Sequence, residues 1–197
     1  DNTGKIVEEE FRRRPGLYKR LEGTLPQLAK FAYRDIILNT AITRANLKEI
    51  LPLAKKAMDW GVSISYSAYT ALRTGDKAYC IDTGEDLETL RQAINEVIEL
   101  KKQSNHIANP KAVLLDTLRF FEQGYKPNCK AGVRFFVVMP DGTFIPCSLH
   151  RNKYSSQKEM IENFSRVNRC GGCYVAIRSY SERPLRDQLK DIPQYGR

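Results

Sequence analysis

The stretch VSISYSAY, residues 62–69, alternates strictly between two kinds of side chain. In an extended chain, one face would carry Val62, Ile64, Tyr66 and Ala68. The other face would carry Ser63, Ser65, Ser67 and Tyr69. This period of two predicts a half-buried β-strand. A β-rich apolar run, DIILNTAIT at residues 35–43, precedes it and predicts a second strand.

Helical patterns separate and follow these strands. Apolar residues recur at helical spacing over residues 16–32, 46–60 and 87–102. We expect Asn46 to cap the second of these helices, and Thr83 or Asp86 to cap the third. Another helix is predicted from Asn109, as N-cap before a proline, to Gln123. Alternation of this kind predicts an α/β fold with a parallel sheet over residues 1–124, half of a barrel or sheet rather than a whole one.

The pattern changes after Gly124, where we expect a domain boundary near 124/125. The sequence VRFFVVMPDGTFIPC predicts a β-hairpin between residues 133 and 147. A short helix near residues 157–164 and a polar tail after Cys173 complete the expectation. Residues 125–197 should therefore form a small α+β, cysteine-rich domain.

Length and composition exclude several classes of protein. A chain of 197 residues is too short for a complete eight-unit α/β barrel. Its 42% hydrophobic and 28% charged residues are typical of a soluble globular protein, and no apolar run is long enough to span a membrane. The first residues do not form a signal peptide and include no methionine, so we expect a fragment or processed chain from the cytoplasm.

The net charge of +9 is concentrated near the C-terminus, where residues 125–197 hold 13 basic and 6 acidic residues. The simplest interpretation is a solvated basic surface. An anionic partner such as nucleic acid is a second interpretation. An anionic metal cluster, whose charge these residues offset, is a third.

Four of the five cysteines fall in this basic segment, with the spacing C-x17-C-x22-C-x2-C: Cys129, Cys147, Cys170 and Cys173. In a reducing compartment, clustered cysteines indicate metal ligands rather than disulfides. The predicted hairpin would bring Cys129 and Cys147 together. Four thiolates suit zinc or an iron–sulfur cluster. A zinc ribbon would offer two C-x2-C turns and this chain has one, which favours a 4Fe–4S cluster; scattered buried thiols remain an alternative.

This cysteine pattern resembles the C-terminal extension of radical S-adenosylmethionine (SAM) enzymes. Twelve residues separate Cys129 from Gly142 and four separate Gly142 from Cys147, and the knuckle Cys170-Gly171-Gly172-Cys173 follows. Because no cysteine follows Cys173, the segment is similar to the shorter, one-cluster Twitch form of the SPASM domain. Upstream, Asp1 resembles the end of a family barrel strand, Glu9 and Arg12 fall near another family segment, and NTAITRANLKEI resembles the fifth strand and its helix.

The resemblance implies the second half of a partial (β/α)6 barrel followed by an auxiliary 4Fe–4S cluster held by the four cysteines. The site residues that it suggests for SAM or substrate are Arg12, Asn39, Ser65 and Ser67. The family's C-x3-C-x2-C motif is absent, so the catalytic cluster would belong to upstream sequence, and no catalytic residue is assigned. The complete enzyme would abstract hydrogen through a 5′-deoxyadenosyl radical, with flavodoxin or ferredoxin as reductant and a peptide, sugar or lipid as substrate.

A different class of function is a non-enzymatic zinc or iron–sulfur module that binds nucleic acid through the basic segment. Upstream sequence carrying the C-x3-C-x2-C motif would distinguish the two. Cys80 is expected to be an ordinary thiol at the height where substrate enters. The lone histidines His106 and His150 are expected to be surface or loop residues.

Overall fold

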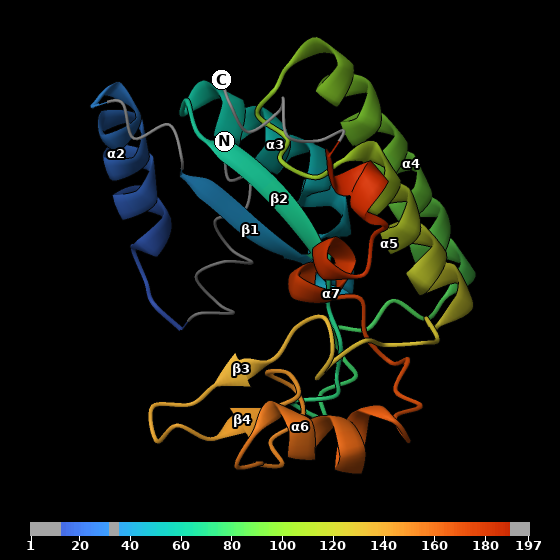
Figure 1. Ribbon diagram of the computed structural model, residues 1–197. Helices are drawn as coiled ribbons and strands as arrows, with labels where there is room; N and C mark the ends of the chain where they lie inside the picture. Colours follow the sequence, from blue (N-terminus) through green and yellow to red (C-terminus); the bar gives the residue numbers. More distant parts are fainter. Residues whose placement is uncertain (1–12, 32–35, 190–197) are drawn as a thin grey trace.

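The computed structural model describes residues 13–31 and 36–189; Asp1, Glu9 and Arg12, to which the resemblance assigns roles, lie outside them. The first region contains α2 (Leu17–Lys30), β1 (Ile37–Ile42), a 3₁₀ turn (Arg44–Glu49), α3 (Ile50–Asp59), β2 (Ser63–Ala68), α4 (Gly84–Gln103) and α5 (Lys111–Gln123). The second contains β3 (Val137–Val138), β4 (Phe144–Ile145), α6 (Gln157–Met160), a π-helical turn (Ile161–Ser165) and α7 (Ala176–Ser181). The hairpin and α6 lie below the α/β region, with α7 between them (Figure 1).

The strands β1 and β2 are parallel and α3 connects them, as the alternating pattern predicts. Their register places Asn39 opposite Ser65. On the other side of β2, Ile107 forms a parallel bridge with Ile64, and main-chain hydrogen bonds join Ile64 to the residues on either side of Ile107. The chain around residue 107 therefore extends the parallel sheet beyond β2.

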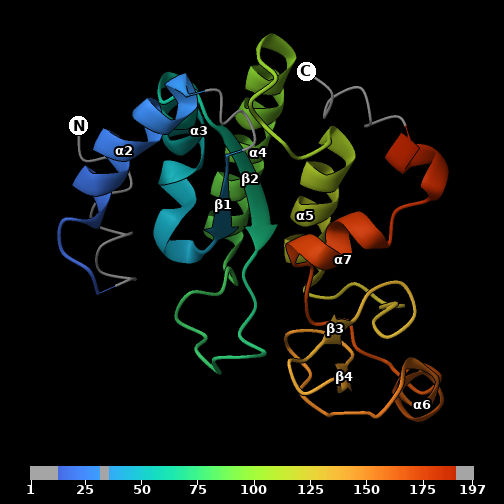
Figure 2. The same cartoon turned by 60° about the vertical axis from the view of Figure 1, so that its left-hand side comes forward.

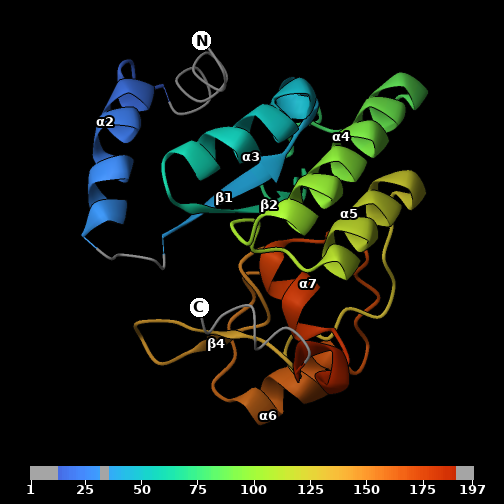
Figure 3. The same ribbon diagram turned by 90° about the horizontal axis from the view of Figure 1, so that it is seen from above.

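Helices α3, α4 and α5 lie side by side along one face of these strands (Figure 3). The predicted apolar face of β2 is confirmed, because its four residues are at most 3% exposed: Val62, Ile64, Tyr66 and Ala68. The hydroxyl of Tyr66 donates to the carbonyl of Ile50 at 2.7 Å, so this buried phenol has a partner in α3. Helix α2 lies at the β1 side and brings Tyr18 against Trp60, with ring centroids 6.0 Å apart.

The predicted starts of two helices are wrong, because the asparagine expected to be the N-cap of each helix makes other hydrogen bonds. The α-helix after β1 begins at Ile50, after the 3₁₀ turn, and not at Asn46. Asn46 accepts a hydrogen bond from the amide of Thr43 at 2.8 Å and donates one to the carbonyl of Ala41 at 2.8 Å, so it closes the turn that ends β1.

Of the two candidate caps of α4, Thr83 is correct: its hydroxyl accepts from the amide of Asp86 at 3.1 Å.

Helix α5 begins at Lys111, so Asn109 does not cap it. The Asn109 side chain is fully buried, accepts from the amide of Tyr66 at 2.6 Å and donates to the carbonyl of the same residue at 3.0 Å. Main-chain hydrogen bonds join Ile64 of β2 to residues 106 and 108. The side-chain amide of Asn109 makes the equivalent pair of hydrogen bonds to Tyr66, two residues further along β2. It fastens the start of α5 to the sheet.

We expect Asn109→Leu to lower the free energy of unfolding by about 3 kcal/mol, because it leaves a buried N–H and a buried C=O of Tyr66 without partners. Chemical denaturation of the chain measures this loss. Asn105→Leu is the matched control, since Asn105 is exposed, and it should change stability by less than about 0.5 kcal/mol. Equal losses in the two variants would contradict a sheet-like role for Asn109.

The hairpin predicted between residues 133 and 147 is present, but each of its strands is only two residues long. Val137 pairs with Ile145 and Val138 with Phe144. Residues 131–135 form a turn instead, with Gly132 donating its amide to the carbonyl of Phe135 at 2.8 Å. Gly132 has a φ of 83°, and a Cβ on it would lie 2.2 Å from the Ser165 hydroxyl, so the turn requires glycine.

The segment after Cys173 is not the polar tail expected from the sequence. It forms α7, which packs against α5 and β2 (Figure 2). Arg178 is fully buried within α7, and Tyr174 just before it is 2% exposed. None of the helices in residues 13–31 and 36–189 is long and apolar enough to cross a membrane.

Candidate metal centre

Four cysteines line one small cavity in the C-terminal region, which we call the thiol cavity: Cys129, Cys147, Cys170 and Cys173. Cys147 and Cys173 are buried and the other two are half-buried. The remaining lining is largely apolar, with His150 and Arg178 as its ionisable members: Phe135, Ser148, Leu149, His150, Val175, Ile177 and Arg178. The structure therefore brings together the four residues that the spacing selects.

The hairpin positions the first two thiols as predicted. Cys147 follows β4 by two residues and packs with Ala131 and Phe135 in an apolar cluster. Cys129 lies against the same cluster. The turn over residues 131–135 packs Ala131 and Phe135 against both cysteines, although 17 residues separate the two in sequence.

Asn168 joins the first cysteine to the third. Its side-chain oxygen accepts from the amide of Cys170 at 2.9 Å, and its side-chain nitrogen donates to the carbonyl of Cys129 at 3.2 Å. The sequence does not point to Asn168, because an asparagine in a loop carries no signal of a partner 39 residues away. One amide thus holds two cysteine-bearing segments in place.

The Gly171-Gly172 turn is docked on neighbouring segments. The carbonyl of Gly171 accepts from the amide of Lys126 at 2.8 Å, and that of Gly172 accepts from the Thr70 hydroxyl at 2.9 Å. A Cβ on Gly171 would lie 2.0 Å from the ring of Tyr125. Glycine therefore allows the knuckle to approach Tyr125, and the knuckle connects to the loop after β2.

Arg178 acts as a buried clamp on the same cavity. Its guanidinium donates to the carbonyls of Cys173 at 2.7 Å, Lys126 at 2.7 Å and Pro127 at 2.9 Å. It also forms an ion pair with Glu182 at 2.9 Å, and Glu182 in turn accepts from the amide of Lys130. Arg178 thereby ties the chain on both sides of Cys129 to the knuckle.

The electrostatics of the thiol cavity depend on what it contains. Burial raises the pKa of Cys129 to about 11 and also raises the pKa of Cys173. Burial disfavours the charge on Arg178, but Glu182 outweighs that effect and the pKa of Arg178 is raised. Cys129 and Cys173 are thus neutral thiols beside a cation, and binding a metal group would release their protons.

Zinc and a four-iron cluster place different demands on four thiolates. In the described part of the chain, no three His, Cys, Asp or Glu side chains are arranged to hold a metal ion. A tetrahedral zinc site needs four sulfurs about 2.3 Å from one centre, and hence about 4 Å from one another. A four-iron cluster takes its thiolates at the corners of a larger body. The four thiols line one cavity but do not form a preassembled ion site in the described part of the chain.

Asn39 and Ser65, which the sequence analysis assigns to a SAM or substrate site, are side by side on the sheet. The Ser65 hydroxyl donates to the Asn39 side-chain oxygen at 3.1 Å. Asn39 is exposed, whereas Ser67, further along the same face, is 8% exposed. These residues lie on the sheet face opposite the helices, and Arg12 lies outside the described residues.

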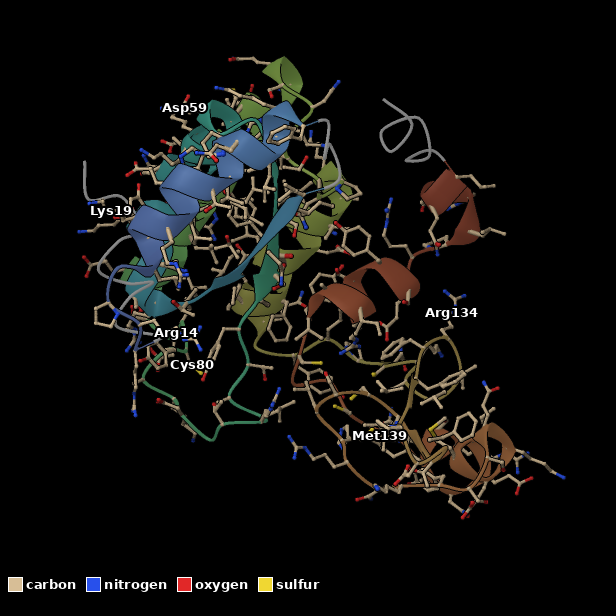
Figure 4. All side chains as sticks on the ribbon, turned by 90° about the vertical axis from the view of Figure 1, so that its left-hand side faces the viewer. Arg14, Lys19, Asp59, Cys80, Arg134 and Met139 are labelled. Atoms are coloured by element: carbon tan, nitrogen blue, oxygen red, sulfur yellow. The ribbon has the colours of Figure 1, made fainter. Side chains whose placement is uncertain are left out.

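A second cavity, of about 360 Å³, lies where β2 ends. Its lining comes from the loop after β2, from α5 and from the knuckle, and includes Tyr69, Leu72, Lys77, Cys80, Phe120 and Gly172. We call it the β2-end cavity. Cys80 lies in the loop below the strands, apart from Arg134 and Met139 of the C-terminal region (Figure 4). Cys80 is thus not a fifth member of the thiol cavity.

Both histidines lie in loops, as expected, but each is half-buried. His106 is half-buried, and its ring contacts the Ala54 carbonyl at 2.9 Å and the Ser104 hydroxyl, which joins α3 to the chain beside β2. Burial lowers the pKa of His106. His150 lines the thiol cavity, and its Nε2 is buried.

Comparisons with protein-family models, with curated proteins and with solved structures found no match to this chain.

Proposed function

We propose that this chain is the C-terminal portion of a radical SAM enzyme, in which the four cysteines hold an auxiliary 4Fe–4S cluster. The observation that carries the proposal is the thiol cavity: four cysteines in the Twitch-like pattern line one cavity beside a buried arginine. With four thiolates such a cluster is anionic in its resting form, and Arg178 places a positive charge at its edge. When bound, the cluster would transfer electrons or stabilise the fold of the C-terminal region.

The α/β region is proposed to be the second half of the enzyme's partial barrel. Parallel β1 and β2, the bridge at Ile107 and helices packed on one face support this arrangement. In a barrel, the opposite face points inward, and here it carries the hydrogen-bonded pair Asn39 and Ser65. We assign these two side chains to SAM or substrate, with the first half of the barrel and the catalytic cluster supplied by upstream sequence, and a ferredoxin or flavodoxin as reductant.

The β2-end cavity is the proposed place of the substrate. It lies at the carboxyl end of a parallel strand, where α/β proteins gather their ligands. Its lining is mostly aromatic and aliphatic, so the bound part of the substrate is apolar, and Lys77 and Cys80 are its reactive or charged members. Gly172 belongs to its wall and also to the knuckle, so the substrate would lie next to the cluster.

A nucleic-acid-binding module is the weaker proposal, because several cations of the basic segment are engaged in internal contacts. Arg178 is buried, Arg134 donates to the carbonyls of residues 181–183, and Lys126 contacts Asp116. Lys153 pairs with Asp141. Contacts to the phosphates of a nucleic acid would therefore fall to the exposed cations of residues 151–169.

Anaerobic reconstitution with iron and sulfide tests the cluster. We expect about four irons and four sulfides per chain. Cys80→Ser is the matched control and should leave this ratio unchanged, whereas Cys147→Ser should reduce it. One tightly bound zinc with no uptake of sulfide would overturn the proposal.

A further inference from the structure

The Nε2 atom of His150 is buried and has no hydrogen-bond partner among the residues that the structure describes. A buried polar atom without a partner destabilises the folded state, and native proteins contain few of them. The His150 ring lines the thiol cavity, three residues after Cys147. Something that occupies this cavity is therefore the natural partner of Nε2.

The His150 ring is held in place by packing. It lies against Phe164 with ring centroids 5.2 Å apart and planes inclined by 58°. The cavity surfaces near it are apolar side chains and thiols, which offer no strong oxygen acceptor: Phe135, Leu149, Val175 and Ile177 with the four cysteines. The thiol sulfurs are thus the acceptors that the lining offers to an imidazole N–H.

Arg178, the other ionisable group in the lining, already has hydrogen-bond partners and also lies close to the Cys173 thiol. Its Nε and both terminal nitrogens already donate to Glu182 and to three main-chain carbonyls. Ser148 is exposed. His150 is thus the described side chain of the lining that has both a donor position and an unmet need for an acceptor.

We propose that His150 donates its Nε2–H to a sulfur of the auxiliary cluster and thereby raises the cluster's reduction potential. The inference rests on the proposed cluster. A hydrogen bond to a cluster sulfur stabilises the added electron, and such bonds are a principal means by which proteins set these potentials. Four cysteines already provide the four iron ligands, so His150 serves as a hydrogen-bond donor and positioning residue.

The chain contains two histidines, which makes a direct spectroscopic test possible. The full chain is labelled with ¹⁵N-histidine, reconstituted anaerobically and reduced, and pulsed EPR then measures the ¹⁵N coupling to the cluster. We expect a weak coupling in the wild type that disappears in His150→Phe and persists in His106→Gln. His106 is the internal control, because it lies between Ala54 and Ser104 in the α/β region.

A redox titration of the same samples gives an independent readout. We expect the midpoint potential of His150→Phe to shift below that of the wild type, and His150→Gln, whose amide can donate, to recover part of the shift. A reconstituted cluster with no histidine coupling and an unchanged potential would overturn the role of His150 alone. A strong coupling typical of an iron-bound nitrogen would overturn it in favour of a ligand. Failure of the wild type to take up iron and sulfide would instead refute the proposed function.

Discussion

Arg178→Met is expected to lower the free energy of unfolding of the C-terminal region by about 3–5 kcal/mol, the usual effect of removing one partner from a buried ion pair. The guanidinium is fully buried and donates to three main-chain carbonyls, so its removal strands those acceptors together with the Glu182 carboxylate. Methionine fills much of the volume but donates nothing. The loss should appear in chemical denaturation of the chain.

The same variant should also lose iron and sulfide on reconstitution, because Arg178 joins the segment before Cys129 to the carbonyl of Cys173. Arg178→Lys keeps the charge but lacks the branched guanidinium that donates to several acceptors at once. We therefore expect it to recover only a part of the lost free energy of unfolding. Arg166→Gln is the matched control, since Arg166 is exposed beyond the π-helical turn. Wild-type stability and iron content in Arg178→Met would show that Arg178 is not a clamp.

Much of the fold follows from patterns with a short period. The alternation over residues 62–69 and the helical spacing over residues 87–102 correspond to β2 and α4, because each periodic face packs on a core. The Pro-Asp-Gly turn likewise predicts the hairpin between Cys129 and Cys147. In these elements the residue and its structural partner are close in sequence, so local pattern carries the information.

The polar contacts that complete the candidate site have no such signal. Asn109 bonds to Tyr66 across 43 residues and Arg178 to Lys126 across 52, and neither residue differs in local context from an ordinary asparagine or arginine. The sequence around the lone His150 likewise gives no indication of its role, because only the position of its ring beside the thiols distinguishes it from a surface histidine. Cysteine spacing could select the thiol ligands but not the residues that hold them in place.

Cys173→Ala is expected to abolish the four-iron stoichiometry and to release the segment between Ser148 and the knuckle. Few apolar residues of this segment are fully buried, so it depends on the metal group closing loops of 17 and 22 residues onto one centre. The substitution removes the thiol but keeps the main-chain carbonyl that accepts from Arg178. It therefore separates the effect of the cluster from that of the clamp.

Limited trypsin digestion under anaerobic conditions measures this release. The segment offers exposed cleavage sites at Arg151, Lys153, Lys158, Arg166 and Arg169. We expect the Cys173→Ala chain to be cut there while α3 and α4 resist, because their apolar faces are buried in the core of the α/β region. Cys80→Ala, which changes a thiol outside the thiol cavity, should be cut no faster than the wild type. If Cys173→Ala is as protected as the wild type, the hydrogen bonds of Asn168, Gly171 and Arg178 hold the segment unaided, and the cluster serves redox chemistry rather than folding.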